Sequence, residues 1–395
     1  MYTPVKLHLL NALLWFAALS CNGNALRSGR DGGVNDLSIS GFDGVGWKDT
    51  AFVEPDGQTN SVQPTVLATN QDFPAAIAVG VSGVYWFNLG ENISNDPLRA
   101  PQPWTHGQIM KCALGDCGGA PTPLVFGRVS ARTVISPVFL LDEMDVYWSD
   151  ATSNVQDVEG SEQLFRCPLD GCANDPESLV VGQVLAASID ASNLYWTTAS
   201  LEIDYRPLSV SVADAAVTVG LFSKAQANAT SGLLVADDSE IYWLYGDRQI
   251  LKCPKIGCND VPFDVKASAE DLPLQIALGT DALYYLAWLP STNGWEVRSC
   301  SKAGCGDQPN ILANELVGPV GIATDSINVY WTEHGSTDHA GLVRKCHADG
   351  CNNQPTIVAT SLTSPGAVVL DLQSVYWVES GISGMANGTI WKAPK

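Results

Sequence analysis

The cysteines are the residues whose spacing points most directly to chemistry. Ten of the eleven form pairs with four residues between the partners, and a glycine or aspartate before the second cysteine indicates a tight turn. Such a turn can bring two cysteines to bonding distance. A metal site needs four ligands where one pair offers two, and redox catalysis would use Cys-x-x-Cys. The spacing favours five structural disulfides: Cys112–Cys117, Cys167–Cys172, Cys253–Cys258, Cys300–Cys305 and Cys346–Cys351.

Carboxylates form a second recurring set, six residues before the second aromatic of a repeated Tyr-Trp motif. Glycine takes their place in two further copies of the motif. A ring of carboxylates can hold calcium, whereas aspartate at the start of a tight turn bonds its own backbone. Because glycine is another turn residue, the turn is favoured; no metal site or cofactor is predicted, and calcium stays the alternative. The residues are Asp142, Asp190, Asp237, Asp325 and Asp371, with Gly80 and Gly279.

Residues just after the Tyr-Trp motif vary from copy to copy, although the motif is regular. Such variation is typical of a binding face on a rigid scaffold, and equally of neutral drift in a loop. A long insertion after the first copy and a histidine-bearing loop in the sixth add further candidates. No catalytic residue is predicted, since no Gly-x-Ser-x-Gly, phosphate loop or His-Glu-x-x-His motif occurs. The candidate binding residues are Asn88, Trp104, Asp150, Trp288, Glu333, His334 and Glu379.

These residues recur because the chain itself repeats. The clearest copy, residues 321–359, reads as four short strands separated by turn residues, with a β-branched and aromatic run at 329–332. One such sheet cannot bury its own faces, so the copies must stack. A period in the forties with four strands per copy predicts an all-β, seven-bladed β-propeller with four-stranded blades. The second residue of the motif falls at Trp86, Trp148, Trp196, Trp243, Tyr285, Trp331 and Trp377.

The last copy ends without its fourth strand. A matching segment stands before the first copy instead, since Gln63–Thr69 is nearly identical to Gln354–Thr360. We expect this N-terminal strand to complete the last blade, which would close the ring and remove two exposed strand edges.

The motifs VYWTE, LYWTT and VYWSD resemble the YWTD repeats of the low-density-lipoprotein-receptor propellers over roughly residues 62–395. Those propellers usually have six blades, whereas this sequence has seven copies. The pairing of VYW with KCxxxGC is also similar to uncharacterised bacterial secreted or lipoprotein propellers. The resemblance implies the fold and a place outside the cytoplasm, and it names no ligand.

Residues 1–21 read as an export signal, with Lys6 ahead of an apolar run too short for a confident membrane span. Residues 18–21 resemble a bacterial lipobox, and Cys21 is the cysteine that pairing leaves over, so we expect it to be lipidated. An ordinary signal peptide cut nearby is the alternative. Residues 22–60 predict a flexible tether, and residues 61–395 the propeller.

The formal net charge of −21 argues against nucleic acid and against anionic membrane surfaces as partners. We expect a monomeric, exported protein, either a bacterial cell-envelope lipoprotein or a secreted one, that contacts the membrane only through a lipid anchor. It would recognise a protein or glycan at the cell envelope. The alternative is a metal-dependent hydrolase or lyase with its site in the central channel, as in propeller lactonases, whose calcium ligands we cannot match here. A third interpretation is a structural envelope component.

Overall fold

Short antiparallel strands make up the described part of the protein. The computed structural model describes residues 63–92, 104–105, 107–129, 138–151, 162–180, 184–198, 203–209, 233–245, 248–258, 261–266, 270–382 and 385–395. Every regular element in these ranges is a β-strand, and none of them contains a helix that could span a membrane. The predicted signal, lipidated Cys21 and tether lie outside the described residues.

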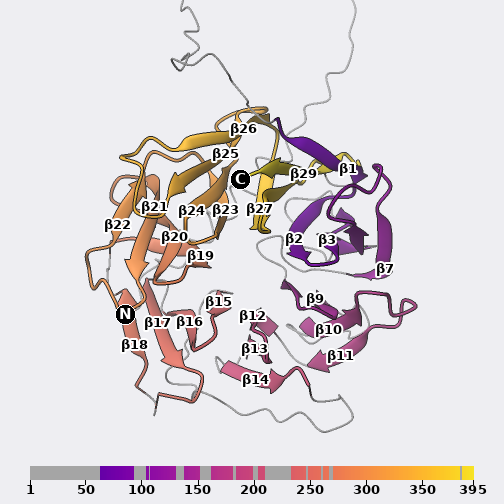
Figure 1. Ribbon diagram of the computed structural model, residues 1–395, viewed down its shortest axis with the longest axis horizontal. Coiled ribbons are helices and arrows are strands. Elements are labelled where there is room, and N and C mark those ends of the chain that lie inside the picture. Colours follow the sequence, from indigo (N-terminus) through magenta and orange to yellow (C-terminus); the bar gives the residue numbers. More distant parts are fainter. Residues whose placement is uncertain are drawn as a thin grey trace, which may run out of the picture. The chain divides into compact units, whose positions relative to one another are not determined.

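Seven sheets follow one another around a central opening (Figure 1). Blade 1 contains β2 (Pro74–Gly80), β3 (Gly83–Asn88), β6 (Gly107–Cys112) and β7 (Thr122–Val129). Blade 2 contains β8 (Phe139–Leu141), β9 (Asp145–Ala151), β10 (Glu162–Pro168) and β11 (Glu177–Val180). Blade 3 contains β12 (Val184–Ile189), β13 (Asn193–Thr198) and β14 (Ile203–Pro207). Blade 4 contains β15 (Leu234–Ala236), β16 (Glu240–Tyr245), β17 (Gln249–Pro254) and β18 (Phe263–Lys266).

The second half of the ring continues the pattern. Blade 5 contains β19 (Leu272–Leu278), β20 (Ala282–Leu289), β21 (Gly294–Ser301) and β22 (Asn310–Ala313). Blade 6 contains β23 (Pro319–Thr324), β24 (Asn328–Glu333), β25 (Gly341–His347) and β26 (Thr356–Leu362). Blade 7 contains β27 (Pro365–Leu370), β28 (Ser374–Glu379), β29 (Gly388–Pro394) and β1 (Thr65–Gln71). The seven-bladed β-propeller is thereby confirmed.

Strand β1 closes the ring as predicted. It pairs antiparallel with β29, with Thr65 opposite Lys392 and Ala68 opposite Ile390. Blade 6 has the same register within itself, where Thr356 lies opposite Lys345. The N-terminal strand therefore supplies the outermost strand of the last blade, and blade 7 has the strand order β1-β29-β28-β27.

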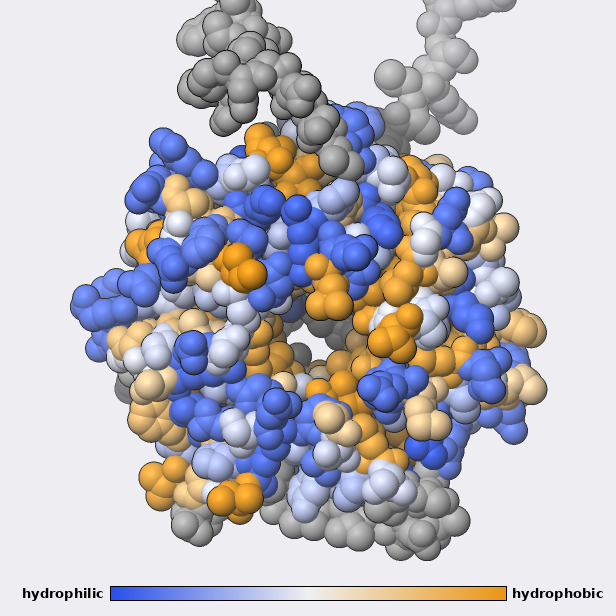
Figure 2. Space-filling model, viewed as in Figure 1, coloured by the Kyte–Doolittle hydropathy of each residue, from blue (hydrophilic) through white to orange (hydrophobic). Residues whose placement is uncertain are grey.

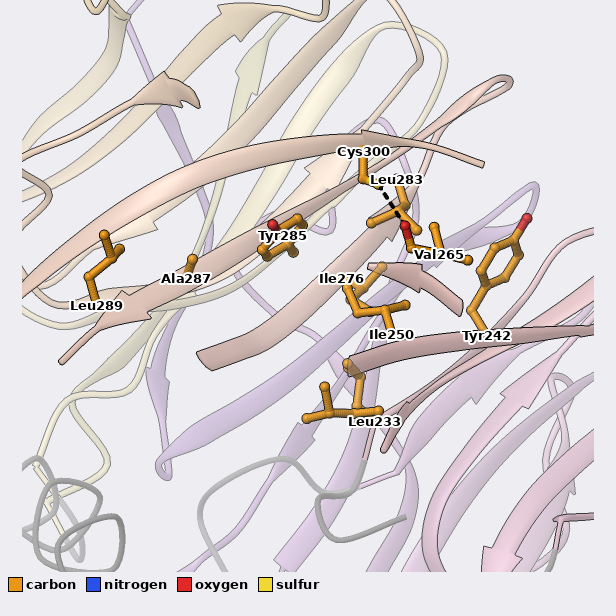
Figure 3. Close-up of a cluster of buried hydrophobic side chains, with 11 residues drawn as sticks. Leu233, Tyr242, Ile250, Val265, Ile276, Leu283, Tyr285, Ala287, Leu289 and Cys300 are labelled. Atoms are coloured by element: carbon orange, nitrogen blue, oxygen red, sulfur yellow. Dashed lines mark hydrogen bonds between the residues drawn. The ribbon is translucent and has the colours of Figure 1, made fainter. Parts of the chain in front are cut away.

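The core lies between neighbouring blades. Side chains alternate between the two faces of a strand, so each sheet buries one set against the blade before it and the other against the blade after it. Figure 3 shows this between blades 4 and 5, where Tyr242, Ile250 and Val265 meet Ile276 and Leu283. The motif supplies the largest fully buried side chains, including Trp86, Trp148, Trp243, Trp331 and Trp377. Truncating one of these to alanine should cost about 3–5 kcal/mol.

The five cysteine pairs bracket the turns that follow the third strands. Their Cα atoms lie 5.3–5.6 Å apart, at bonding distance. Blade 3 has Arg206 at this place, opposite Leu194, just as Cys253 lies opposite Ile241 in blade 4. Blade 7 has Ala393 there, opposite Val375. Disulfides in these turns are compatible with an extracellular protein.

Candidate functional site

The antiparallel strand order divides the connections between two faces of the ring. One face, here called the loop face, carries the loops from second to third strands and the links from blade to blade. The opposite turn face carries the turns from first to second strands and the cysteine-bracketed turns. Most of the candidates from the sequence stand where second strands end, so they lie at the loop face. Of Trp104, the structure describes only the backbone, which pairs with Asn92 in the short β4 (Glu91–Asn92) and β5 (Trp104–Thr105) ladder.

The recurring aspartates on the turn face bond their own turns. Asp142 Oδ1 accepts from the backbone nitrogens of Met144 and Asp145 at 2.7 and 2.6 Å, and its Oδ2 accepts from the Tyr147 hydroxyl at 2.8 Å. The other four aspartates accept the same pair of backbone bonds. These contacts support the interpretation of the aspartates as turn residues rather than as calcium ligands. Within the described ranges, no three His, Cys, Asp or Glu side chains gather as a metal site.

Glu333 sits inside its blade and holds the backbone of the neighbouring strand. Only 1% of its surface is exposed. Its Oε1 accepts from Trp331 Nε1 and its Oε2 from the backbone nitrogen of Val317, both at 2.9 Å, while Arg344 lies 3.3 Å away. Its carboxylate is therefore committed to the segment that leads into β23, which is a structural role.

Glu379 repeats this arrangement one blade later. Its carboxylate accepts from the backbone nitrogen of Thr363 at 2.5 Å and from Trp391 Nε1 at 2.7 Å. In blade 1, Asn88 is 3% exposed and donates to Gln71 Oε1, which also accepts from Trp86 Nε1. Glu379 and Asn88 thus hold neighbouring segments of the chain together. Asp150 is likewise buried, at 6% exposure.

Trp288 occupies a different register position from the other candidates. Glu333 lies opposite Pro319 in its blade, and the residue opposite the corresponding Pro273 in blade 5 is Ala287. Trp288 stands three residues after Tyr285, whereas Glu333 stands two residues after Trp331, so Trp288 is not at the position equivalent to Glu333. Its side chain points to the other face of β20, toward blade 6.

There Trp288 meets a second tryptophan that sequence reasoning missed. Trp295 lies directly opposite it on β21, with ring centroids 4.9 Å apart and planes inclined by 53°. Both rings are partly exposed. The inner side of Trp295 packs against the buried cluster of Leu286, Val297 and Trp331. The signal in the sequence was a Pro-Ser-Thr-Asn-Gly turn between two tryptophans, which places them across a hairpin.

The histidine loop of blade 6 lies against the entry to blade 7. His334 Nδ1 is 3.4 Å from Ser364 Oγ, and His339 Nδ1 is 3.2 Å from Thr363 Oγ1. Burial lowers the pKa of His334, which favours its neutral imidazole. The backbone of the same loop is bonded to the segment that leads into β23, because His334 N donates to Gly318 O at 2.9 Å. The histidine loop therefore joins the segments that enter blades 6 and 7 on the loop face.

A buried ion cluster joins blades 4 and 5. Asp271, just ahead of β19, accepts from Arg298 Nη1 at 2.7 Å and from the Tyr285 hydroxyl at 3.2 Å, and it pairs with Lys266 of blade 4. Both Lys266 and Asp271 have fully buried side chains. Tyr285 stands where most blades have tryptophan, and its hydroxyl donates to Asp271 of the cluster. A buried, paired network of this kind fixes geometry.

The central opening is apolar. The seven innermost strands contain no acidic, basic, histidine, cysteine or tyrosine residue, and their only side chains with hydrogen-bonding groups are Ser188, Gln275 and Thr324. Figure 2 shows the opening with hydrophobic side chains around it.

Comparison with known proteins supports the fold and no finer assignment. No protein-family model matches the chain, and no curated protein matches it. Among solved structures, the computationally designed protein Ika8 aligns with a TM-score of 0.50 at 10% identity, covering 84% of this chain and 100% of the designed one. Puromycin hydrolase aligns at 0.51 and 11% identity over 79% of this chain and 50% of the hydrolase. The propeller domain of the Trilobed protease from Pyrococcus furiosus, whose topology is described as open velcro, aligns at 0.51 and 6% identity, covering 82% and 97%. This chain shares the propeller architecture with these proteins.

Proposed function

We propose that this protein is an exported binding propeller that recognises a glycan or protein partner at the cell envelope. The observation that carries the proposal is the partly exposed pair Trp288 and Trp295, whose rings pack against each other at the loop face of blade 5. Large, rigid aromatic side chains at a surface contribute most strongly to recognition. The loop of His334 and His339, on the same face of blade 6, adds hydrogen-bonding groups.

The composition of the opening supports binding over a channel hydrolase. A catalytic metal needs carboxylate, imidazole or thiolate ligands, and the innermost strands carry none of these side chains. The recurring carboxylates bond turns on the opposite side of the blades instead.

Export and envelope location belong to the same proposal. Five cysteine pairs at bonding distance suit an oxidising compartment. A lipobox-like cysteine at Cys21 would hold the propeller at a bacterial envelope through its N-terminal tether. Labelling with radioactive palmitate in a bacterial host should mark the wild-type protein and leave Cys21→Ser unlabelled. Palmitate on neither protein would exclude the lipid anchor.

Binding is tested with the purified full chain. We would measure its saturable binding to an array of neutral and acidic oligosaccharides and to solubilised bacterial envelope proteins. A double Trp288→Ala, Trp295→Ala variant should lose the binding. A Tyr245→Ala variant, which removes a partly exposed aromatic from the same end of blade 4, should keep it. Absence of saturable binding to either panel would contradict the proposal.

A further inference from the structure

We infer that the tryptophan pair of blade 5 is a subsite for one pyranose ring of a neutral glycan. The inference rests on the proposed binding function and gives its ligand class. It comes from three features of the β20–β21 hairpin: the geometry of the two indoles, the chemistry of the hairpin tip, and the pairing of the surrounding charges.

The indoles form one stacking surface rather than an extended platform. Because their planes are inclined by 53° with centroids 4.9 Å apart, they pack against each other. Trp295 packs against the buried cluster that contains Leu286 and Val297, and its carbonyl accepts from the backbone nitrogen of Leu316 at 3.3 Å. A rigid ring that loses little side-chain entropy suits stacking against the apolar C–H face of a sugar.

The hairpin tip beside the pair carries uncharged hydrogen-bonding groups. Ser291, Thr292 and Asn293 are all exposed and connect the two tryptophan-bearing strands. Asn293 has a φ of 54°, a left-handed conformation that asparagine tolerates, and it fixes the tip geometry. Hydroxyl and amide groups next to an aromatic face match a ligand with sugar hydroxyls around an apolar ring.

The nearby charges are already paired with one another. Glu296 accepts from Arg298 Nε at 2.7 Å, and Arg298 also contacts Asp271. Arg344 lies 3.3 Å from Glu333. Neither Arg298 nor Arg344 is therefore left uncommitted to attract an acidic sugar, and exposed Glu315 disfavours a uronic or sialic acid further. A basic peptide would require several uncommitted carboxylates, whereas Glu296 and Glu333 are committed.

Val317 extends the subsite toward blade 6. It is 45% exposed and follows Leu316, the residue that bonds Trp295. Its backbone is fixed by Glu333 on one side and by Gly335, whose nitrogen donates to Val317 O at 3.1 Å. The apolar surface therefore continues from the indoles toward the His334 loop, which gives a second sugar unit a place to contact.

The test uses the full chain and isothermal titration with defined probes. The probes are N-acetylchitotetraose and cellotetraose as neutral glycans, tetragalacturonate as an acidic one, and a lysine-rich peptide. We expect saturable binding of a neutral tetrasaccharide, weakened at least about tenfold by Trp288→Ala or Trp295→Ala. Trp295→Phe should keep most of the affinity, and Asn293→Gly, which retains the left-handed backbone, should lose several-fold.

Two controls distinguish a loss of binding from a loss of folding. Tyr245→Ala should bind as wild type, and thermal unfolding of each variant should show a single transition near that of the wild type. If Trp295→Ala unfolds, Trp295→Phe and Asn293→Gly still decide the question. Binding of the acidic probe or the peptide through the tryptophans would overturn the ligand class. Neutral-glycan binding that is indifferent to both tryptophans would overturn the site but leave the proposed function standing. A wild-type protein that binds neither oligosaccharides nor envelope proteins would refute both.

Discussion

Lys302 of blade 5 donates a hydrogen bond from Nζ to Asp237 Oδ2 of blade 4 at 2.7 Å, although the two residues are 65 positions apart. The other oxygen of Asp237 accepts from the backbone nitrogens of Ser239 and Glu240 at 2.9 and 2.8 Å. One carboxylate thus closes its own turn and ties its blade to the next. Two further pairs repeat the arrangement: Lys255 with Asp190, and Lys395 with Asp325.

The Lys302–Asp237 pair should make stability depend on acid pH. Burial acts to raise the pKa of Asp237, but the bonds from Lys302 and the turn outweigh it and lower that pKa from 3.8 to about 2. The stabilisation is therefore present above about pH 4 and lost as pH falls toward 2. We expect Lys302→Met to lower the free energy of unfolding at pH 7 by about 1 kcal/mol and to weaken its dependence on pH between 4 and 2. Urea unfolding across this range measures both effects.

A matched control for that prediction is Ala348→Met. Ala348 holds the equivalent place in blade 6, where the preceding blade has Gly279 instead of aspartate. An unchanged acid dependence in Lys302→Met would show that the turn alone sets the pKa of Asp237.

Each turn disulfide should contribute modestly and independently. Cys300 and Cys305 close a short loop, for which the loop-entropy relation gives about 2 kcal/mol. The double Cys300→Ser, Cys305→Ser variant should lose that amount in urea unfolding without reductant. Removing the Cys112–Cys117 pair as well should add a similar loss, because the two turns are in different blades. A loss that appears only when both pairs are removed would contradict independent action.

Because β1 closes the ring, the same substitution at two neighbouring residues of β1 should have very different effects on stability. Ala68 is fully buried and lies opposite Ile390, so Ala68→Asp buries a charge and should destabilise the ring by more than about 3 kcal/mol. Thr69 is exposed, and Thr69→Asp should change stability by less than about 0.5 kcal/mol. Guanidinium unfolding compares them, and equal effects would mean that β1 is dispensable for closure.

His334 should make the ring less stable in mild acid. Its pKa is lowered by burial from 6.5, so the unfolded chain takes up the proton first as pH falls below about 6.5, and stability declines there. His334→Gln should flatten this decline between pH 7 and 5.5, measured by urea unfolding. A steep slope that survives in His334→Gln would assign it to another group.

The fold was predictable because its signals are local and repeated. Tyr-Trp runs alternate between two buried faces of a strand, so Trp331 and its counterparts read directly as core. The closing strand was predictable because Gln63–Thr69 copies Gln354–Thr360, and the copied residues take the copied register. The aspartate turns also followed from residue type and spacing alone.

The candidate site was harder to predict because its contacts join distant segments. Glu333 and Glu379 are variable positions after a motif, yet each accepts from a backbone nitrogen 16 residues earlier. Only the assembled blade brings those groups together. Trp295 was missed because its importance depends on facing Trp288 across a hairpin.

The cysteine turns have a consequence for how such a ring can change over generations. Each of the five bonds starts and ends within a single turn of a single blade. A recombination event that duplicates or deletes one whole repeat therefore breaks no covalent bond and separates no bonded partners. Crosslinks between blades would have tied the copy number to the pattern of pairing. Because each disulfide is confined to a single repeat, a lineage can change the number of blades while every remaining cysteine pair stays intact.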